Sequence, residues 1–218
     1  MNNEHTSRIL TSLTLLPVLI LCCYYSGFYL IFFLSIIYFF SSFEIIKNTK
    51  NILFNLFANI ILILALFSFY YLRGDTNYSL IIIYWILFST FLSDIGGYIF
   101  GKIFKGKKLT TISPNKTYSG SIGSIFLSLI SIPFIHLVQH FLFKENLINF
   151  LNIKFLCLTI LISVVCQLGD LFVSLCKRKK KIKNTSNLLP GHGGVLDRID
   201  GLIFVLIFSF ILEKINLI

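Results

Sequence analysis

The chain has 218 residues, of which 56% are hydrophobic and only 13% are charged. Because a water-soluble domain of this size needs about twice that charged fraction, these values exclude a soluble globular protein. The formal net charge of +10 would suit nucleic acid, but the basic residues stand in short loops between apolar runs, as in membrane proteins, so we expect no nucleic-acid partner.

Long apolar runs recur along the chain and predict an all-α fold, a polytopic helical integral membrane protein. The runs are continuous rather than alternating apolar and polar, which argues against a β-barrel. We expect a single membrane-embedded domain over residues 1–218, with about seven transmembrane helices and no internal repeat. In chain order, the expected spans are residues 9–25, 27–44, 51–72, 78–100, 121–143, 155–176 and 199–213.

The first two expected spans are short and are joined through Ser26 and Gly27, so a hairpin and a tilted pair are both open. Arg8 precedes the first span and no small-residue cleavage site follows it, which favours a retained helix over a signal peptide. If the N-terminus is cytoplasmic, all but four of the 19 Lys and Arg residues fall on the cytoplasmic side. The basic loops at 101–120 and 177–198 then both face the cytoplasm.

Asp170 stands inside an apolar run, where a carboxylate costs at least ~2.5 kcal/mol and usually has a task. Ser174 and Lys177 follow four and seven residues later, so all three side chains would share one helix face. They would point into one cavity near the cytoplasmic surface. The alternative is that Asp170 only pairs with Lys177 or Arg178 to make insertion tolerable.

Asp197 and Asp200 are three residues apart and would share a face of a helix that begins near Leu196. Together with Asp170 they would form an oxygen site that suits Mg²⁺. The alternative is that the two acids stabilise a helix N-terminus, where negative charge is favourable.

A glycine turn precedes these acids. Gly191, Gly193 and Gly194 allow backbone N–H groups to converge on an anion, and His192 could donate a hydrogen bond to a phosphate. The alternative is an ordinary tight turn. In the basic run before it, we expect Lys177 and Arg178 to contact phosphate and residues 179–181 to form a patch attracted to anionic lipid.

The loop at 101–120 adds a second group of candidates. Asp94 is another predicted buried acid near a helix end, and residues 113–117 predict a polar turn that places Lys116 against a phosphate. Residues 101–107 resemble a P-loop, but Lys108 stands where Ser or Thr is needed and a membrane helix precedes the segment, so we reject a P-loop. Glu44, near the end of the second span, is expected to pair with a lysine.

At these residues the chain resembles the phosphatidate cytidylyltransferase (CDP-diacylglycerol synthase) family. The family's C-terminal motif reads S-x-x-K-R, a Lys-Asp pair, then P-G-H-G-G-x-x-D-R-x-D. The residues in register are Gly169, Asp170, Ser174, Lys177, Arg178, Pro190, Gly191, His192, Gly193, Gly194, Asp197, Arg198 and Asp200. Asp94 with the glycines after it, and Ser113-Pro114-x-Lys116-Thr117, resemble the middle motif; Arg8-Ile9-x-Thr11 with Pro17 resembles the family's start. Two departures are Asn184 and Ser119, where the family pattern has acids.

The resemblance implies an enzyme, a nucleotidyltransferase that makes CDP-diacylglycerol and pyrophosphate from CTP and phosphatidic acid in phospholipid biosynthesis. It implies Mg²⁺ held by Asp170 and Asp197, with a second cation left open. The implied catalytic residues are Asp170, Ser174, Lys177, Arg178, His192, Asp197, Arg198 and Asp200. The implied substrate-binding residues are Asp94, Ser113, Lys116, Thr117, Gly191, Gly193 and Gly194. We expect a bacterial inner (plasma) membrane, with the site facing the cytoplasm and a homodimer as an open alternative.

Four other functions are weighed against this one. A CDP-alcohol phosphotransferase would carry a D-G-x₂-A-R-x₈-G-x₃-D-x₃-D helix, a string that this sequence lacks; a polyprenol kinase is a second enzyme of membrane lipids. A transporter with Asp94 and Asp170 as ion sites would be expected to show charges at mid-membrane and an internal repeat. An inactive relative that only binds lipid is suggested by Asn184.

Overall fold

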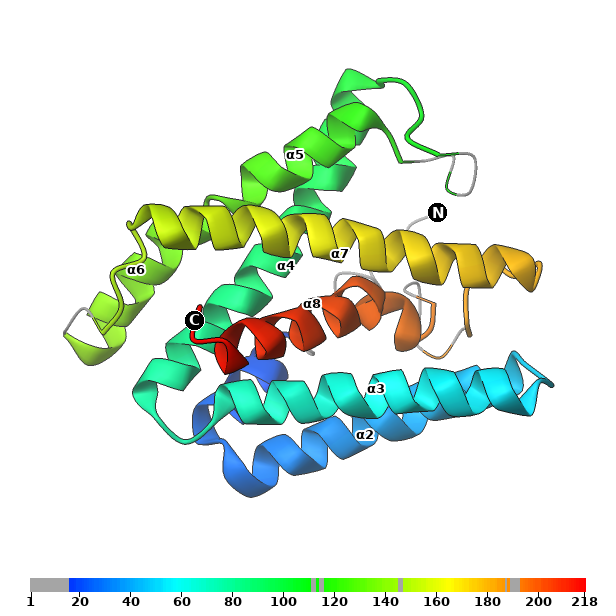
Figure 1. Cartoon of the computed structure of the whole chain (residues 1–218), viewed down its shortest axis with the longest axis horizontal. Helices are drawn as coiled ribbons and strands as arrows, with labels where there is room; N and C mark the ends of the chain where they lie inside the picture. Colours follow the sequence, from blue (N-terminus) through cyan, green and yellow to red (C-terminus); the bar gives the residue numbers. More distant parts are fainter. Residues whose placement is uncertain (1–15, 111–112, 114–115, 145–146, 187, 189–192) are drawn as a thin grey trace.

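A computed structural model describes residues 16–110, 113, 116–144, 147–186, 188 and 193–218 (Figure 1). The described part is helical, with one isolated antiparallel bridge between Lys108 and Thr117 and no named strand. The described residues begin with an apolar helix over Leu16–Tyr25. The helices after it are α2 (Gly27–Lys47), α3 (Ile52–Arg73), α4 (Asn77–Phe104), α5 (Tyr118–Ser128), α6 (Ser131–Phe143), α7 (Ile153–Lys179) and α8 (Leu196–Lys214).

The prediction of an all-α membrane protein is confirmed in its coarse form. Five segments are long and apolar enough to cross a membrane: α2, α3, α4, the pair α5–α6 and α7. Each expected span contains a helix; of the first span only residues 16–25 are described, and α8 is not among the five. Charged residues at both ends of α8 lower its suitability as a span. The expectation of about seven transmembrane helices therefore stays a prediction.

Side-chain caps explain where several helices begin. Asn51, Thr117 and Asn152 each accept a backbone N–H from the first turn of the helix that follows them, and Thr76 forms a capping box with Ser79. The expected span 121–143 is broken at Leu129 and Ile130 into α5 and α6. The apolar composition is continuous across this break, so hydropathy alone did not indicate it.

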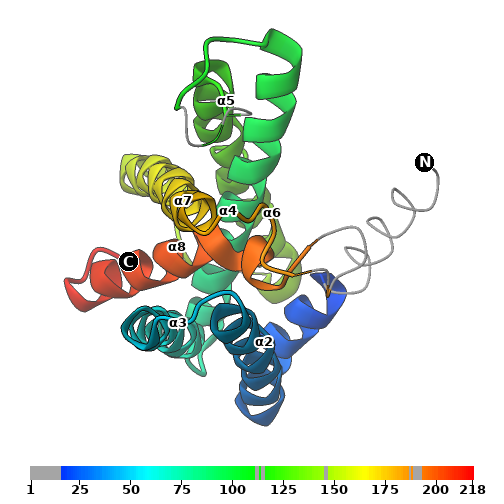
Figure 2. The ribbon, with the colours of Figure 1, turned by 90° about the vertical axis from the view of Figure 1, so that its right-hand side faces the viewer.

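Helix α4 is the centre of the fold, and the other helices surround it in Figure 2. In the apolar part of α4, 67% is buried inside the protein, against a third or less in the other candidate spans. It lies so close to α5 that a Cβ added at Gly96 would collide with the backbone of Gly123. Small residues allow this approach, which membrane helices use in place of a hydrophobic driving force.

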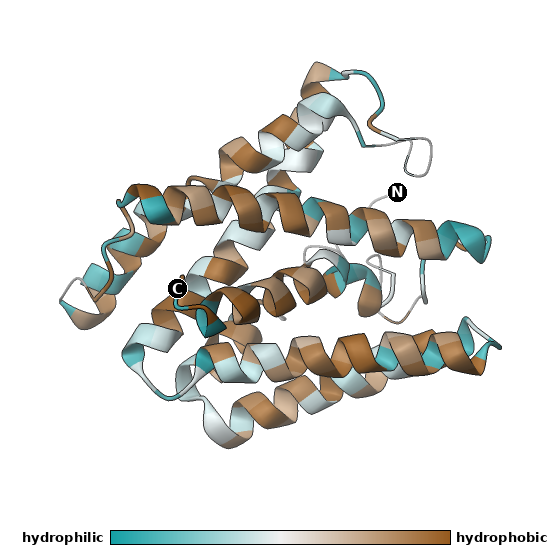
Figure 3. Cartoon of the chain, in the orientation of Figure 1, coloured by the Kyte–Doolittle hydropathy of each residue, from teal (hydrophilic) through white to brown (hydrophobic). Residues whose placement is uncertain are grey.

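Hydrogen bonds between buried side chains join α4 to its neighbours. Ser93 contacts Ser163 of α7 at 2.8 Å, and Trp85 donates to Thr159 of α7 at 3.1 Å. Figure 3 shows hydrophobic residues along the helix shafts and hydrophilic residues at helix ends and at the start of α8. The polar residues near the start of α8 form the candidate site.

Candidate active site

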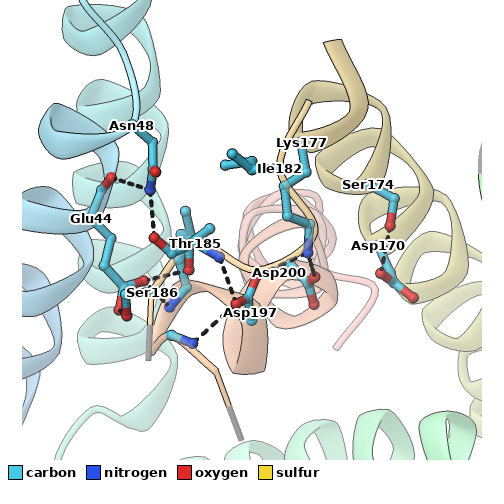
Figure 4. Close-up of polar contacts among 12 residues, drawn as sticks. Glu44, Asn48, Asp170, Ser174, Lys177, Ile182, Thr185, Ser186, Asp197 and Asp200 are labelled. Atoms are coloured by element: carbon cyan, nitrogen blue, oxygen red, sulfur yellow. Dashed lines mark hydrogen bonds and ion pairs between the residues drawn. The ribbon is translucent and has the colours of Figure 1, made fainter. Parts of the chain in front are cut away.

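The centre of the site is an ammonium shared by two carboxylates. Lys177, near the end of α7, donates to Asp197 Oδ1 at 3.0 Å and to Asp200 Oδ2 at 3.3 Å (Figure 4). All three side chains are largely buried. The expectation that Asp197 and Asp200 share a face of α8 is confirmed, because one ammonium reaches both.

Asp197 also holds the chain that leads into α8. Its Oδ2 atom accepts the backbone N–H groups of Thr185 (2.8 Å) and Gly194 (3.0 Å). Gly193 has a φ of +84°, a backbone conformation that favours glycine. Asp197 therefore stabilises the start of α8, as the alternative role in the sequence analysis describes, and it also binds Lys177.

Asp170 lies on α7 beside this group. Ser174 Oγ donates to Asp170 Oδ1 at 3.4 Å, which confirms the predicted shared face for these two residues, and Lys116 Nζ lies 2.5 Å from Asp170 Oδ2. Lys177 pairs instead with Asp197 and Asp200, and it lines a cavity that Asp170 and Ser174 do not line. The ion-pair partner of Asp170 is thus Lys116, from the loop before α5, rather than Lys177 or Arg178. The Asp170 side chain is 31% exposed and that of Asp197 only 8%.

Asp94 lies ten residues before the end of α4 at Phe104, because α4 continues past the expected boundary. Part of its surface is exposed, but protein groups surround its carboxylate, so the predicted burial holds for the charged group. Its Oδ1 atom is 3.5 Å from the Sγ atom of Cys166. The carboxylates of Asp94, Asp170 and Asp200 are close enough for their charges to repel. Positive charge is therefore favoured among them.

Ser113 and Thr117 shape the loop that presents Lys116. The Lys116 N–H donates to the carbonyl of Ser113 at 3.0 Å, and Thr117 caps α5 by accepting the N–H of Gly120. Ser119 Oγ accepts the N–H of Gly106 at 3.3 Å. In the family pattern an acid stands at position 119; here its hydroxyl ties the loop before it to α5.

The remaining predicted residues are placed less centrally or not at all. Gly191 and His192 lie outside the described residues, and the anion-binding turn stays a prediction. Arg178 is exposed and its Nη1 atom donates to the carbonyl of Ile182 at 3.5 Å, at the end of α7. Arg198 is exposed in the first turn of α8.

Glu44 is a site residue whose role sequence reasoning missed. Its carboxylate is fully buried and accepts hydrogen bonds from Thr185 Oγ1, Ser186 Oγ, Val195 N and Leu196 N, at 2.7–3.0 Å. The expectation of a lysine partner was wrong, because hydroxyl and backbone donors from the far end of the chain fill this position. An acid inside an apolar run was the available signal, the same one that singled out Asp170.

The carboxylates have the chemistry of a magnesium site. The expected three-carboxylate site of Asp170, Asp197 and Asp200 is not formed, because among the described residues no three His, Cys, Asp or Glu side chains gather as metal ligands. One or two carboxylates are left as ligands. Asp170 and Asp197 each already hold a lysine ammonium, which shows that a cation is favourable at both. Mg²⁺ is commonly bound by one or two carboxylates with water and substrate phosphates. The residues therefore fit this ion, and its presence stays a prediction.

An apolar cavity of about 90 Å³ adjoins the charged group. It lies among α2, α3, α7 and α8, and Lys177 and Lys180 belong to its lining. Lys180 Nζ stands 4.0 Å from the centre of the Phe54 ring, also in the lining. Other lining residues are Ala58, Leu62, Phe172, Val173, Cys176 and Phe204.

Comparison with known proteins identifies relatives of the chain. The sequence model of the cytidylyltransferase family matches residues 49–215. The phosphatidate cytidylyltransferase of Bacillus subtilis (strain 168) is 34% identical over 172 residues, which are 77% of this chain and 61% of that protein. Those of Staphylococcus haemolyticus (41% over 140 residues) and Rickettsia conorii (36% over 147 residues) align with 63% and 64% of this chain and with 50% and 60% of their own lengths. The chain thus spans about half to three fifths of the curated relatives it matches.

Proposed function

The chain belongs to the cytidylyltransferase family, and from this we propose that it is a phosphatidate cytidylyltransferase, which makes CDP-diacylglycerol and pyrophosphate from CTP and phosphatidic acid. The names of the relatives support the proposal. So do the motif residues Ser174, Lys177, Asp197 and Asp200, which stand in the family's register.

One observation carries the proposal: Lys177 belongs both to the charged group and to the apolar cavity. A reaction between a water-soluble nucleotide and a lipid phosphate needs a place where charge and hydrocarbon meet. The acyl part of phosphatidic acid would use the apolar lining, and its phosphate would lie near Lys177. CTP would enter from the side of Asp170 and Lys116.

In the proposed reaction a phosphate oxygen of phosphatidic acid attacks the α-phosphorus of CTP. The bond from that phosphorus to the oxygen bridging it to the β-phosphate breaks, and pyrophosphate leaves. Positioning and charge neutralisation suffice for such a step, without a covalent enzyme intermediate. Lys177 and Lys116 supply positive charge, and Asp197, Asp200 and Asp170 hold these ammonium groups in place.

We propose Asp170 and Asp197 as the residues that hold Mg²⁺, with a second cation as an open alternative. When bound, the ion would neutralise and orient the CTP phosphates. Lys116 and Lys177 occupy positions beside these carboxylates, so each has to share its carboxylate with the ion or move off it.

We also propose a bacterial inner membrane with the site facing the cytoplasm. The apolar helices and bacterial relatives support a bacterial membrane, and the basic loops at 101–120 and 177–198 support the orientation. A homodimer is an open alternative, and a protein mass of twice that of one chain in detergent would support it.

The test is release of pyrophosphate by the purified chain with phosphatidic acid in detergent. We expect turnover that requires CTP, Mg²⁺ and the lipid, and that is lost in Asp197→Asn, since an amide would set an NH₂ group against Lys177 or against two backbone N–H donors. Asn184→Asp, which restores the family's acid, is run beside it. Absence of turnover in both the natural chain and Asn184→Asp would reject the proposal in favour of lipid binding or transport.

A further inference from the structure

Among the described acidic residues, only Glu44 is fully buried, with 0% of its surface exposed. It lies in the last turn of α2. In Figure 4, Thr185 and Asp197 stand between Glu44 and Lys177. Burying a carboxylate costs roughly several kcal/mol unless hydrogen-bond donors surround it. The donors of Glu44 are therefore the first indication of its role.

The four donors are divided evenly between the two carboxylate oxygens. Oε1 accepts from Ser186 Oγ (2.7 Å) and Val195 N (2.8 Å), and Oε2 accepts from Thr185 Oγ1 (2.8 Å) and Leu196 N (3.0 Å). Each oxygen thus takes one hydroxyl and one backbone N–H, one from each end of residues 185–196. Glu44 joins the two ends of this segment.

Neighbouring residues hold the same two ends. Asn48 Nδ2, one turn after Glu44, donates to the Thr185 carbonyl at 2.6 Å, and Asp197 Oδ2 accepts from Thr185 N and Gly194 N. The approach is so close that a Cβ added at Gly194 would collide with Thr185 Oγ1 and with the Glu44 carboxylate. Glycine at 194 is therefore required by Glu44 as well as by the turn.

The N-terminus of α8 is fixed by this arrangement. Val195 and Leu196 carry backbone N–H groups at the start of the helix, which have no acceptor within it, and a negative charge there is favourable. Glu44 supplies both the acceptors and the charge. The first turn that follows carries Asp197 and, three residues on, Asp200.

We propose that Glu44 is a positioning residue for the active site: its carboxylate fixes the start of α8 and the ends of residues 185–196, and so sets where Asp197 and Asp200 meet Lys177. This inference rests on the proposed function, since it assigns Glu44 a part in that reaction. Glu44 acts through Asp197 and Asp200, to which it is joined by the first turn of α8; its carboxylate is fully buried among its four donors.

Glu44→Gln is a sharp test because it keeps the shape and replaces one acceptor oxygen with an NH₂ group. In either orientation that NH₂ group faces a backbone N–H, of Val195 or of Leu196, and neither can accept it. We expect kcat to fall about 10–100-fold at saturating CTP and phosphatidic acid, as for other residues that orient an active-site group. Amide hydrogen exchange should accelerate in residues 193–198 and stay unchanged in α4 and α7.

The matched control is Ser41→Ala. Ser41 is fully buried in α2, one turn before Glu44, and its hydroxyl has no hydrogen-bond partner among the described residues. We expect kcat and amide exchange in this variant to equal those of the natural chain. If Glu44→Gln does not fold, the double variant Thr185→Val/Ser186→Ala removes the two hydroxyl donors and leaves the bonds to α8; it should show a smaller loss of kcat with the same local change in exchange.

Two outcomes would overturn the proposal. One is natural kcat and natural exchange in Glu44→Gln or, where that variant does not fold, in the double variant. The other is faster exchange throughout the protein with kcat per folded molecule unchanged, which would make Glu44 a residue of stability alone. If the natural chain releases no pyrophosphate, the proposed function fails, and exchange of residues 193–198 in the same samples still decides whether Glu44 fixes this segment.

Discussion

The hairpin of α2 and α3 has a buried charge near each of its ends, and the two charges are accommodated in opposite ways. Near one end, Arg73 is 5% exposed and donates to the carbonyls of Cys23, Tyr24 (3.1 Å) and Gly74 (2.9 Å). Near the other, Glu44 is 0% exposed and accepts from hydroxyl and backbone N–H groups. A cation meets carbonyls at the end of one helix, and an anion meets N–H groups at the start of another.

The difference lies in what each charge holds. Arg73 joins the end of the Leu16–Tyr25 helix to the end of α3, and no predicted site residue takes part in that contact. Glu44 holds the segment that leads into Asp197 and Asp200. Although both charges are buried, we therefore expect substitution of Arg73 to lower stability and substitution of Glu44 to lower turnover.

The largest effect is expected at the Glu44 end, from Lys177→Met. It removes the ammonium between Asp197 and Asp200 and the positive charge proposed for the lipid phosphate, and turnover should fall about 10²–10³-fold. Pyrophosphate release with phosphatidic acid measures it. Lys179→Met, an exposed lysine at the end of the same helix, is the control and should stay near the natural rate; equal losses in both would mean that only the charge of the surface matters.

A smaller effect, of another kind, is expected at the Arg73 end. Arg73→Met leaves the carbonyls of Cys23 and Tyr24 without their charged donor, and the free energy of unfolding should fall by about 1.5–3 kcal/mol. The measurement is the thermal midpoint in detergent, together with kcat per folded molecule, which should be unchanged. The exposed Lys214, bonded to the Tyr71 hydroxyl at 2.6 Å, gives the control Lys214→Met with little change. Loss of kcat in the folded Arg73 variant would break the contrast between the two ends.

The smallest effect concerns the cavity at the Glu44 end. Cys176→Phe adds bulk to its lining and should exclude part of an acyl chain from the cavity. Loss of burial of one acyl methylene costs ~0.8 kcal/mol, so the KM for phosphatidic acid should rise about fourfold. The KM for CTP should not change. Cys157→Phe, at an exposed cysteine of the same helix, is the control. A rise in the KM for CTP alone would place the nucleotide, and not the lipid, in this cavity.

The sequence predicted the helices well and the contacts between distant loops poorly. Apolar runs bounded by polar loops located α3 to within a residue at each end, since burial in lipid forces backbone pairing inside a helix. The shared face of Asp170 and Ser174 followed from helix geometry alone. The ion pair of Asp170 with Lys116 and the donors of Glu44 depend on how separate helices pack, which a periodicity does not contain.

The bonds of Glu44 also bear on how the protein is made. Synthesis proceeds from the N-terminus, and the donors to this carboxylate follow it by 141 to 152 positions. When α2 of a nascent chain is inserted, the hydrogen-bond donors to Glu44 have not yet been synthesised. The final contacts of α2 form only after α8 has been made. Chains interrupted before residue 185 leave that acid without these donors inside an apolar helix.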